Sequence, residues 1–110
     1  MESAEKQEKE MEELQIIEQR LNNILMQKQS FQIELSETQS ALKELAESEG
    51  DVFRVIGQLM VKSSREKMNE ELSNKEKIID MKINSLEKQE SSFMEKLEFL
   101  RDKVLKTMKK

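Results

Sequence analysis

The sequence predicts a mainly α-helical protein: a long antiparallel coiled-coil helical hairpin with a β-hairpin inserted at the bend, oligomerising through a shared β-barrel. Three observations lead to this fold class. The 110-residue chain is 38% charged and contains no proline, a composition typical of long helices. Apolar residues recur in alternating steps of three and four on both sides of a central segment. That segment holds two short apolar runs around a glycine. We therefore expect a single domain over residues 1–110.

The first helix is predicted over residues 4–48, where the apolar spacing is that of a coiled-coil seam. Eight of ten successive seam positions are apolar, and a disordered chain, which the high charge would also permit, would not keep this phase. Gly50 follows and marks the end of the helix. The ten seam positions are Leu14, Ile17, Leu21, Ile24, Lys28, Phe31, Leu35, Thr38, Leu42 and Leu45.

Two polar residues, Lys28 and Thr38, lie within this seam and have two interpretations. Polar seam residues can fix the register of the paired helices or their choice of partner. Alternatively, the lysine extends its charge to water along its aliphatic stem, and the threonine only packs its methyl group.

The second helix is predicted over residues 64–108, and its start is indicated by the capping-box spacing of Ser63 and Glu66. Opposite charges at the outer ends favour antiparallel pairing, since residues 2–13 hold six Glu and two Lys while residues 101–110 hold five basic residues and one Asp. The seam consists of Leu72, Ile79, Leu86, Phe93 and Leu100, with the companion positions Asn69, Glu76, Ile83, Glu90, Leu97 and Val104.

Residues 51–62 predict a β-hairpin, because the helical period is lost and Gly57-Gln58 separates two runs rich in Val and Ile. Glycine at the first central position fits a type II′ turn. A lone hairpin is marginal in water, and two helices are too thin to cover it, so we expect it to join hairpins of other subunits. The alternative is a buried turn with incidental apolar content. The expected assembly residues are Val52, Phe53, Val55, Ile56, Leu59, Met60 and Val61.

Several function classes are excluded or disfavoured by composition. Without cysteine or histidine, the chain has no disulfide, no Cys/His zinc site and no histidine catalysis, and it lacks a glycine-rich phosphate loop. We therefore expect no enzyme activity, catalytic residue, metal or cofactor. A net charge of −4 disfavours nucleic acid. No run of about 18 apolar residues could span a membrane, and no secretory signal is present, so a cytoplasmic location is expected.

The helix ends that are not joined to the hairpin carry apolar residues outside the seam. Exposed apolar surface often marks a binding site, but these residues could equally widen the contact between the helices. They are Met11, Ile16, Phe99, Leu105 and Met108, which accompany the seam residues Leu14, Ile17, Leu100 and Val104.

Three stretches make the sequence resemble the β-type subunit of prefoldin, in its archaeal form. They are residues 25–31, residues 51–62 with the core Val-Phe-Arg-Val-Ile-Gly, and residues 86–90. Phe53 stands where tyrosine is common in that family. The presence of one predicted β-hairpin rather than two points to the β type rather than the α type.

The resemblance implies a subunit of a hexamer with two α-type and four β-type subunits, joined by their hairpins. It implies an ATP-independent chaperone that holds non-native client proteins between its coil tips and passes them to a group II chaperonin. The client-binding residues would then be Met11, Leu14, Ile17, Phe99, Leu100, Val104 and Met108. A structural coiled-coil adaptor for one folded partner is the alternative function, but it does not explain the hairpin.

Overall fold

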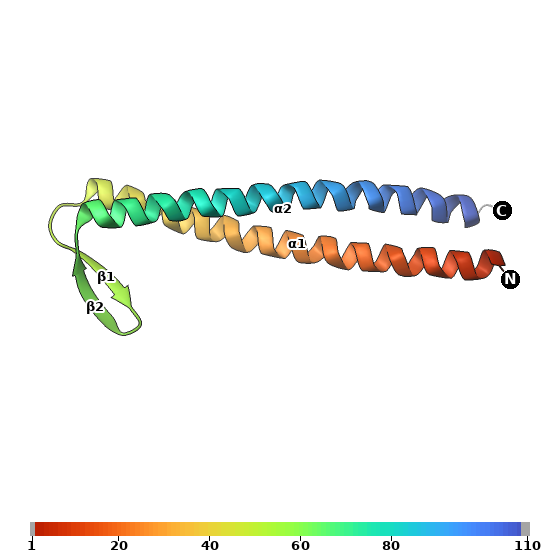
Figure 1. Ribbon diagram of the computed structural model, residues 1–110, viewed down its shortest axis with the longest axis horizontal. Coiled ribbons are helices and arrows are strands. Elements are labelled where there is room, and N and C mark those ends of the chain that lie inside the picture. Colours follow the sequence, from red (N-terminus) through yellow and green to blue (C-terminus); the bar gives the residue numbers. More distant parts are fainter. Residues whose placement is uncertain (1, 109–110) are drawn as a thin grey trace. The chain divides into compact units, whose positions relative to one another are not determined.

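The structure is a computed structural model that describes residues 2–108. Helix α1 spans Glu2–Glu47, strand β1 Val52–Ile56, strand β2 Leu59–Ser63 and helix α2 Arg65–Met108 (Figure 1). This order confirms the predicted helical hairpin with an inserted β-hairpin. The chain forms two compact units. We call the one with the described residues up to Gln29 and from Asn84 onward the terminal unit, and the one with Ser30–Ile83 the hairpin unit.

In the terminal unit, the N-terminal half of α1 pairs with the C-terminal half of α2 along the predicted seam (Figure 1). Side chains three and four residues apart lie on one face of a helix, which is why the seam residues are covered while their neighbours are exposed. The buried apolar residues of this unit are Ile24, Leu86, Leu97, Leu100 and Val104, and Leu14, Ile17, Leu21 and Phe93 are partly buried.

In the hairpin unit, the predicted seam residues Ile79 and Ile83 are buried, and Leu35 and Leu72 are partly buried. One predicted seam position is wrong: Asn69 is exposed, and Met68 is partly buried in its place. An α-helix has 3.6 residues per turn rather than the 3.5 of a strict heptad, so a seam can drift by one residue near its end.

The β-hairpin is antiparallel, and the pairing of Ile56 with Leu59 leaves Gly57 and Gln58 as a two-residue turn. Gly57 has a φ of 60°, and no other residue type in the described chain has a positive φ. A positive φ at Gly57 and a negative one at Gln58 agree with the predicted type II′ turn. Gly50 also has a positive φ, 99°, but it lies in the connection after α1 rather than in the last helical turn.

The first turn of α2 is capped by Ser64, whose Oγ accepts a hydrogen bond from the Lys67 backbone nitrogen at 3.1 Å. The predicted capping box of Ser63 and Glu66 is therefore wrong by one residue. Ser63 instead ends strand β2, where it pairs with Val52. Strand β2 thus ends one residue beyond the hairpin predicted over residues 51–62.

Arg65, the first residue of α2, forms hydrogen bonds across the bend to the end of α1 and the connection after it. Its Nη1 donates to the Leu45 carbonyl oxygen and to Ser48 Oγ, the latter at 3.4 Å, and its Nη2 donates to the Gly50 carbonyl oxygen at 2.9 Å. The last carbonyl groups of a helix have no partner within the helix and carry partial negative charge. A single guanidinium therefore holds the C-terminal end of α1 and the connection to the hairpin.

Candidate assembly surface and arm tips

The β-hairpin carries apolar side chains on both of its faces. Successive residues of a strand point to opposite faces, and directly paired residues share one. From the register, we define the first face by Val52, Arg54, Ile56, Leu59, Val61 and Ser63. The second face consists of Phe53, Val55, Met60 and Lys62. Four of six residues on the first face and three of four on the second are apolar, so neither face is suited to water.

The structure leaves most of this apolar surface uncovered. Val55, Leu59 and Met60 expose 68–69% of their surface, and Ile56 exposes 55%. Phe53 and Val61 are also exposed, whereas Val52 is partly buried. Contiguous apolar surface of this kind marks a site of protein association. All seven predicted assembly residues thus lie on the hairpin, and six of them are available to a partner.

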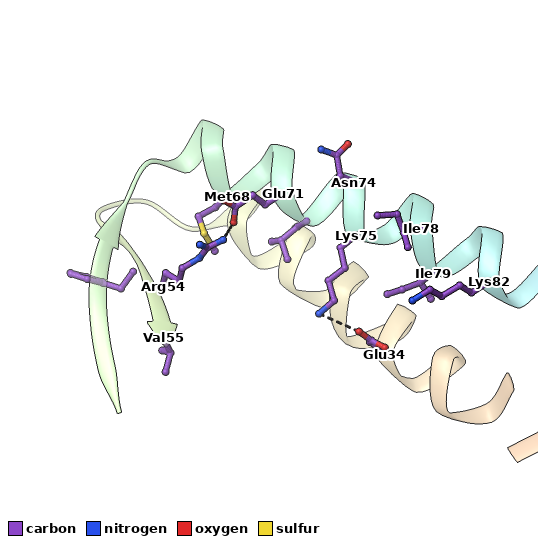
Figure 2. A pocket seen from close by; sticks show the side chains of 12 residues that line it. Glu34, Arg54, Val55, Met68, Glu71, Asn74, Lys75, Ile78, Ile79 and Lys82 are labelled. Atoms are coloured by element: carbon purple, nitrogen blue, oxygen red, sulfur yellow. Dashed lines mark ion pairs between the residues drawn. The ribbon is translucent and has the colours of Figure 1, made fainter. Parts of the chain in front are cut away.

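An ion pair joins the hairpin to α2. Arg54 of β1 forms an ion pair with Glu71 of α2, and Figure 2 shows its side chain directed at Glu71 and Met68. Beside this ion pair is an open groove between β1 and the helices, with Val55 on the strand and Ile78 on α2 among its lining residues. This ion pair uses charged groups, and most apolar side chains of the hairpin stay exposed.

The helix ends in the terminal unit present a mixed surface, which we call the tip and define as residues 4–17 of α1 and 97–108 of α2. The two ends lie side by side (Figure 1). Of the seven residues predicted to bind clients, Met11, Phe99 and Met108 are exposed, and Leu14 and Ile17 are partly buried. Leu100 and Val104 are only 7% exposed, so the closed seam does not present them to solvent.

Other exposed apolar residues extend the tip surface. Ile16 and Leu105 are 51% and 55% exposed, so they belong to the candidate surface as well. The Lys103 ammonium lies 4.7 Å from the centre of the Phe99 ring, within reach of a cation–π interaction. The tip therefore combines dispersed apolar side chains with charged ones.

Lys28 and Glu90, the polar seam residues of the two helices, face each other. Lys28 Nζ lies 3.1 Å from Glu90 Oε2 and 3.8 Å from Glu87 Oε1, and the side chains of Lys28 and Glu90 are each only 21% exposed. This contact supports the register interpretation of Lys28, because the pair forms only when these two layers coincide. Thr38 is different: its Oγ1 donates to the Glu34 carbonyl oxygen of its own helix at 2.8 Å, which leaves its methyl group to pack.

Glu10 is a further polar seam residue, and it lies before Leu14, where the predicted seam began. It lies four residues before Leu14, only 7% of its surface is exposed, and its Oε2 has no hydrogen-bond partner among the described residues. The spacing could have revealed it, because continuing the seam backward from Leu14 by one step reaches this position.

Within residues 2–108, no three acidic side chains gather in a way that could hold a metal ion. No helix among them is long and apolar enough to cross a membrane.

The sequence comparison identifies the family. The family model described as "Prefoldin subunit" matches residues 3–110, nearly the whole chain. The chain belongs to the prefoldin subunit family. This is a family of chaperones with a coiled-coil helical architecture, and the resemblance seen in the sequence is thereby confirmed.

Individual relatives agree with this assignment. The prefoldin subunit beta of Thermococcus onnurineus is 37% identical over 94 residues, which cover 84% of this chain and 81% of the relative. The corresponding protein of Pyrococcus furiosus is 32% identical over 94 residues, or 84% of this chain and 80% of the relative. The crystal structure of the prefoldin beta subunit from Thermococcus strain KS-1 superimposes with a TM-score of 0.83 at 31% identity, covering 90% of this chain and 89% of that one.

Proposed function

We propose that this prefoldin chain is a β-type subunit of an ATP-independent chaperone that holds non-native proteins at its coiled-coil tips and hands them to a group II chaperonin. Its partners would be α-type subunits in a hexamer of two α-type and four β-type chains. The complex would act in the cytoplasm without a cofactor and without catalysis.

The observation that carries the proposal is the pair of exposed apolar faces on the β-hairpin. Strands buried on both faces are typical of the interior of an assembly rather than of an isolated two-stranded sheet. Joining hairpins into a shared β-barrel would pair the free edges and cover one face. Neighbouring parts of the complex would then cover the other. A coiled-coil adaptor would have no use for this two-sided surface.

The tips supply the second part of the function. Met11, Phe99 and Met108 offer separate apolar contacts, and methionine adapts its shape to different partners. The tip of one subunit would bind an unfolded chain weakly. Several tips in one complex raise the effective concentration of binding sites and hence the overall affinity. Such contacts need no nucleotide, because holding a client requires no conformational change driven by ATP hydrolysis.

The direct test is an aggregation assay on the assembled complex. The chain is co-expressed with an α-type prefoldin subunit, and a chemically denatured protein is diluted into buffer with the purified complex and without nucleotide. We expect light scattering to fall as the complex approaches a one-to-one ratio with the client. Aggregation that is unchanged at this ratio would refute the proposed function, and bovine serum albumin at equal mass serves as the control.

A further inference from the structure

The β-hairpin is joined to the helices by short connections. Strand β2 runs into α2 through the single residue Ser64, and β1 follows α1 after residues 48–51. A groove of about 720 Å³ lies between β1 and the helices, so the strand is not packed closely against them. A few residues at the end of an element can absorb a large change in direction. The connections alone therefore do not fix the orientation of the hairpin.

The ion pair of Arg54 and Glu71 spans the joint between β2 and α2 (Figure 2). Arg54 is the central residue of β1, and its partner Val61 lies about 7 Å along β2 from the last strand residue, at 3.3–3.4 Å per residue. Glu71 lies about 9 Å along α2 from its first residue, at 1.5 Å per residue. The ion pair thus forms the third side of a triangle with the strand and the helix, and it sets the angle between them.

Among the described residues, this is the ion pair that joins a strand to a helix. Lys62, the other basic residue of the strands, pairs at 3.5 Å with Asp51 in the connection directly before β1, so that contact cannot set the angle to α2. Arg54 is also the one charged residue on the first hairpin face. Because Glu71 of the same chain supplies the opposite charge, this face could be buried between subunits without an unpaired charge.

We propose that Glu71 is a positioning residue for subunit assembly, because its ion pair with Arg54 fixes the orientation in which the hairpin meets other subunits. The inference rests on the proposed function, in which hairpins join the subunits. A hairpin that already has its final orientation loses less conformational freedom on binding. The two side chains are 43% and 35% exposed, so solvent screens the pair and the gain is modest. We expect Glu71→Gln to raise the concentration at which half of the complex dissociates by about three- to tenfold.

Spin labels measure the orientation of the hairpin, and the lack of native cysteine lets two labels be placed selectively. Gln58→Cys in the turn and Lys77→Cys on the exposed side of α2 carry them. Double electron–electron resonance is recorded on the full chain with an excess of unlabelled chain, so that only the distance within one chain is measured. We expect a narrow distance distribution in the wild type and a wider one in Glu71→Gln. The charge-swapped variant Arg54→Glu with Glu71→Arg should restore the narrow distribution.

Assembly of the unlabelled variants, each co-expressed with the α-type subunit, is measured by mass photometry as the purified complex is diluted. The charge-swapped variant should dissociate near the wild-type concentration. Glu34→Gln is the matched control, because it breaks the ion pair with Lys75 that joins the two helices and not the hairpin. The side chains of that pair are 41% and 51% exposed, similar to those of the Arg54–Glu71 pair. The control should change neither the distance distribution nor assembly.

An unchanged distance distribution in Glu71→Gln would overturn the inference, and so would a wider distribution with unchanged assembly. A charge swap that restores the distances but not assembly would also overturn it, since Arg54 would then act through a carboxylate of a neighbouring subunit. Failure of the wild-type chain to join the α-type subunit at all would instead refute the proposed function, and the inference with it.

Discussion

The ion pair between Lys28 and Glu90 gives a quantitative prediction about the stability of the paired helices. With their charged atoms 3.1 Å apart, the two groups attract each other by ~5 kcal/mol at an effective dielectric constant of ~20. Desolvation offsets much of this gain because both side chains are 21% exposed. We therefore expect a net coupling of about 1–2 kcal/mol, above the ~0.2–1 kcal/mol of fully exposed pairs.

A double-mutant cycle measures this coupling. Lys28→Met keeps the aliphatic stem but leaves Glu90 without its nearest partner, which should destabilise the protein by about 2 kcal/mol and lower its Tm by roughly 5–10 °C. Glu90→Met should cost a similar amount. The double variant should lose about 1–2 kcal/mol less than the sum of the two single losses, because two apolar residues replace a desolvated pair. Thermal unfolding is followed by circular dichroism at 222 nm at one fixed protein concentration, since assembly contributes to stability.

The charge-reversed variant Lys28→Glu with Glu90→Lys separates pairing from simple packing. It should unfold near the wild-type temperature, whereas each reversal alone places two like charges together and should be the least stable of the series. If the two single losses simply add in the double variant, the residues are not coupled, and the register role of Lys28 is refuted.

Three further predictions concern the hairpin, the bend and the tip. Leu59→Lys on the first hairpin face and Met60→Lys on the second should each weaken assembly about 30-fold or more, because each removes ~2 kcal/mol of apolar burial; size-exclusion chromatography with light scattering measures this. Arg65→Met removes the donors that hold the end of α1 and should lower stability by about 1–3 kcal/mol in thermal unfolding. Deletion of residues 1–13 and 101–110 should abolish client holding and leave the hexamer intact in native mass spectrometry.

Each of these predictions has a control or a contrary outcome. Gln58→Lys, in the exposed turn, should leave assembly unchanged, and normal assembly of either face variant would show that this face stays in solvent. For the bend, Arg20→Met on the exposed side of α1 should shift stability by less than about 0.5 kcal/mol. Loss of the hexamer on deleting the helix ends would assign them a structural role.

Much of the fold follows from local patterns in the sequence. The spacing of Leu14, Ile17 and Leu21 predicts a helix with a narrow apolar face, and Gly57 predicts the turn because its φ of 60° suits glycine best. These features depend on neighbouring residues only. The family resemblance and the apolar hairpin follow from the same stretches, so the architecture could be predicted from sequence, while the role of the hairpin residues in assembly stays a prediction.

The features that sequence could not predict depend on how distant segments meet. Arg65 reads as an ordinary first-turn residue, and only the bend brings its guanidinium to the carbonyl groups of Leu45 and Gly50. The seam predicts that Leu100 and Val104 face α1, yet pattern alone does not tell whether a helix end is open or closed. Their burial is a property of the paired helices, and it decides whether they can bind a client directly.

The polar seam residues of α1 differ in how well their polar groups are hydrogen-bonded. Thr38 satisfies its hydroxyl group within its own helix and needs no partner. Lys28 depends on Glu90 of the opposite helix, so it stabilises only the correct register. Glu10 has no hydrogen-bond partner for its buried oxygen among the described residues. From the hairpin side of α1 toward its N-terminal end, each polar residue in the seam is therefore less well compensated than the one before. Among the polar seam residues of α1, the hydrogen bonding is therefore complete at Thr38, nearest the hairpin, and incomplete at Glu10, nearest the N-terminal end.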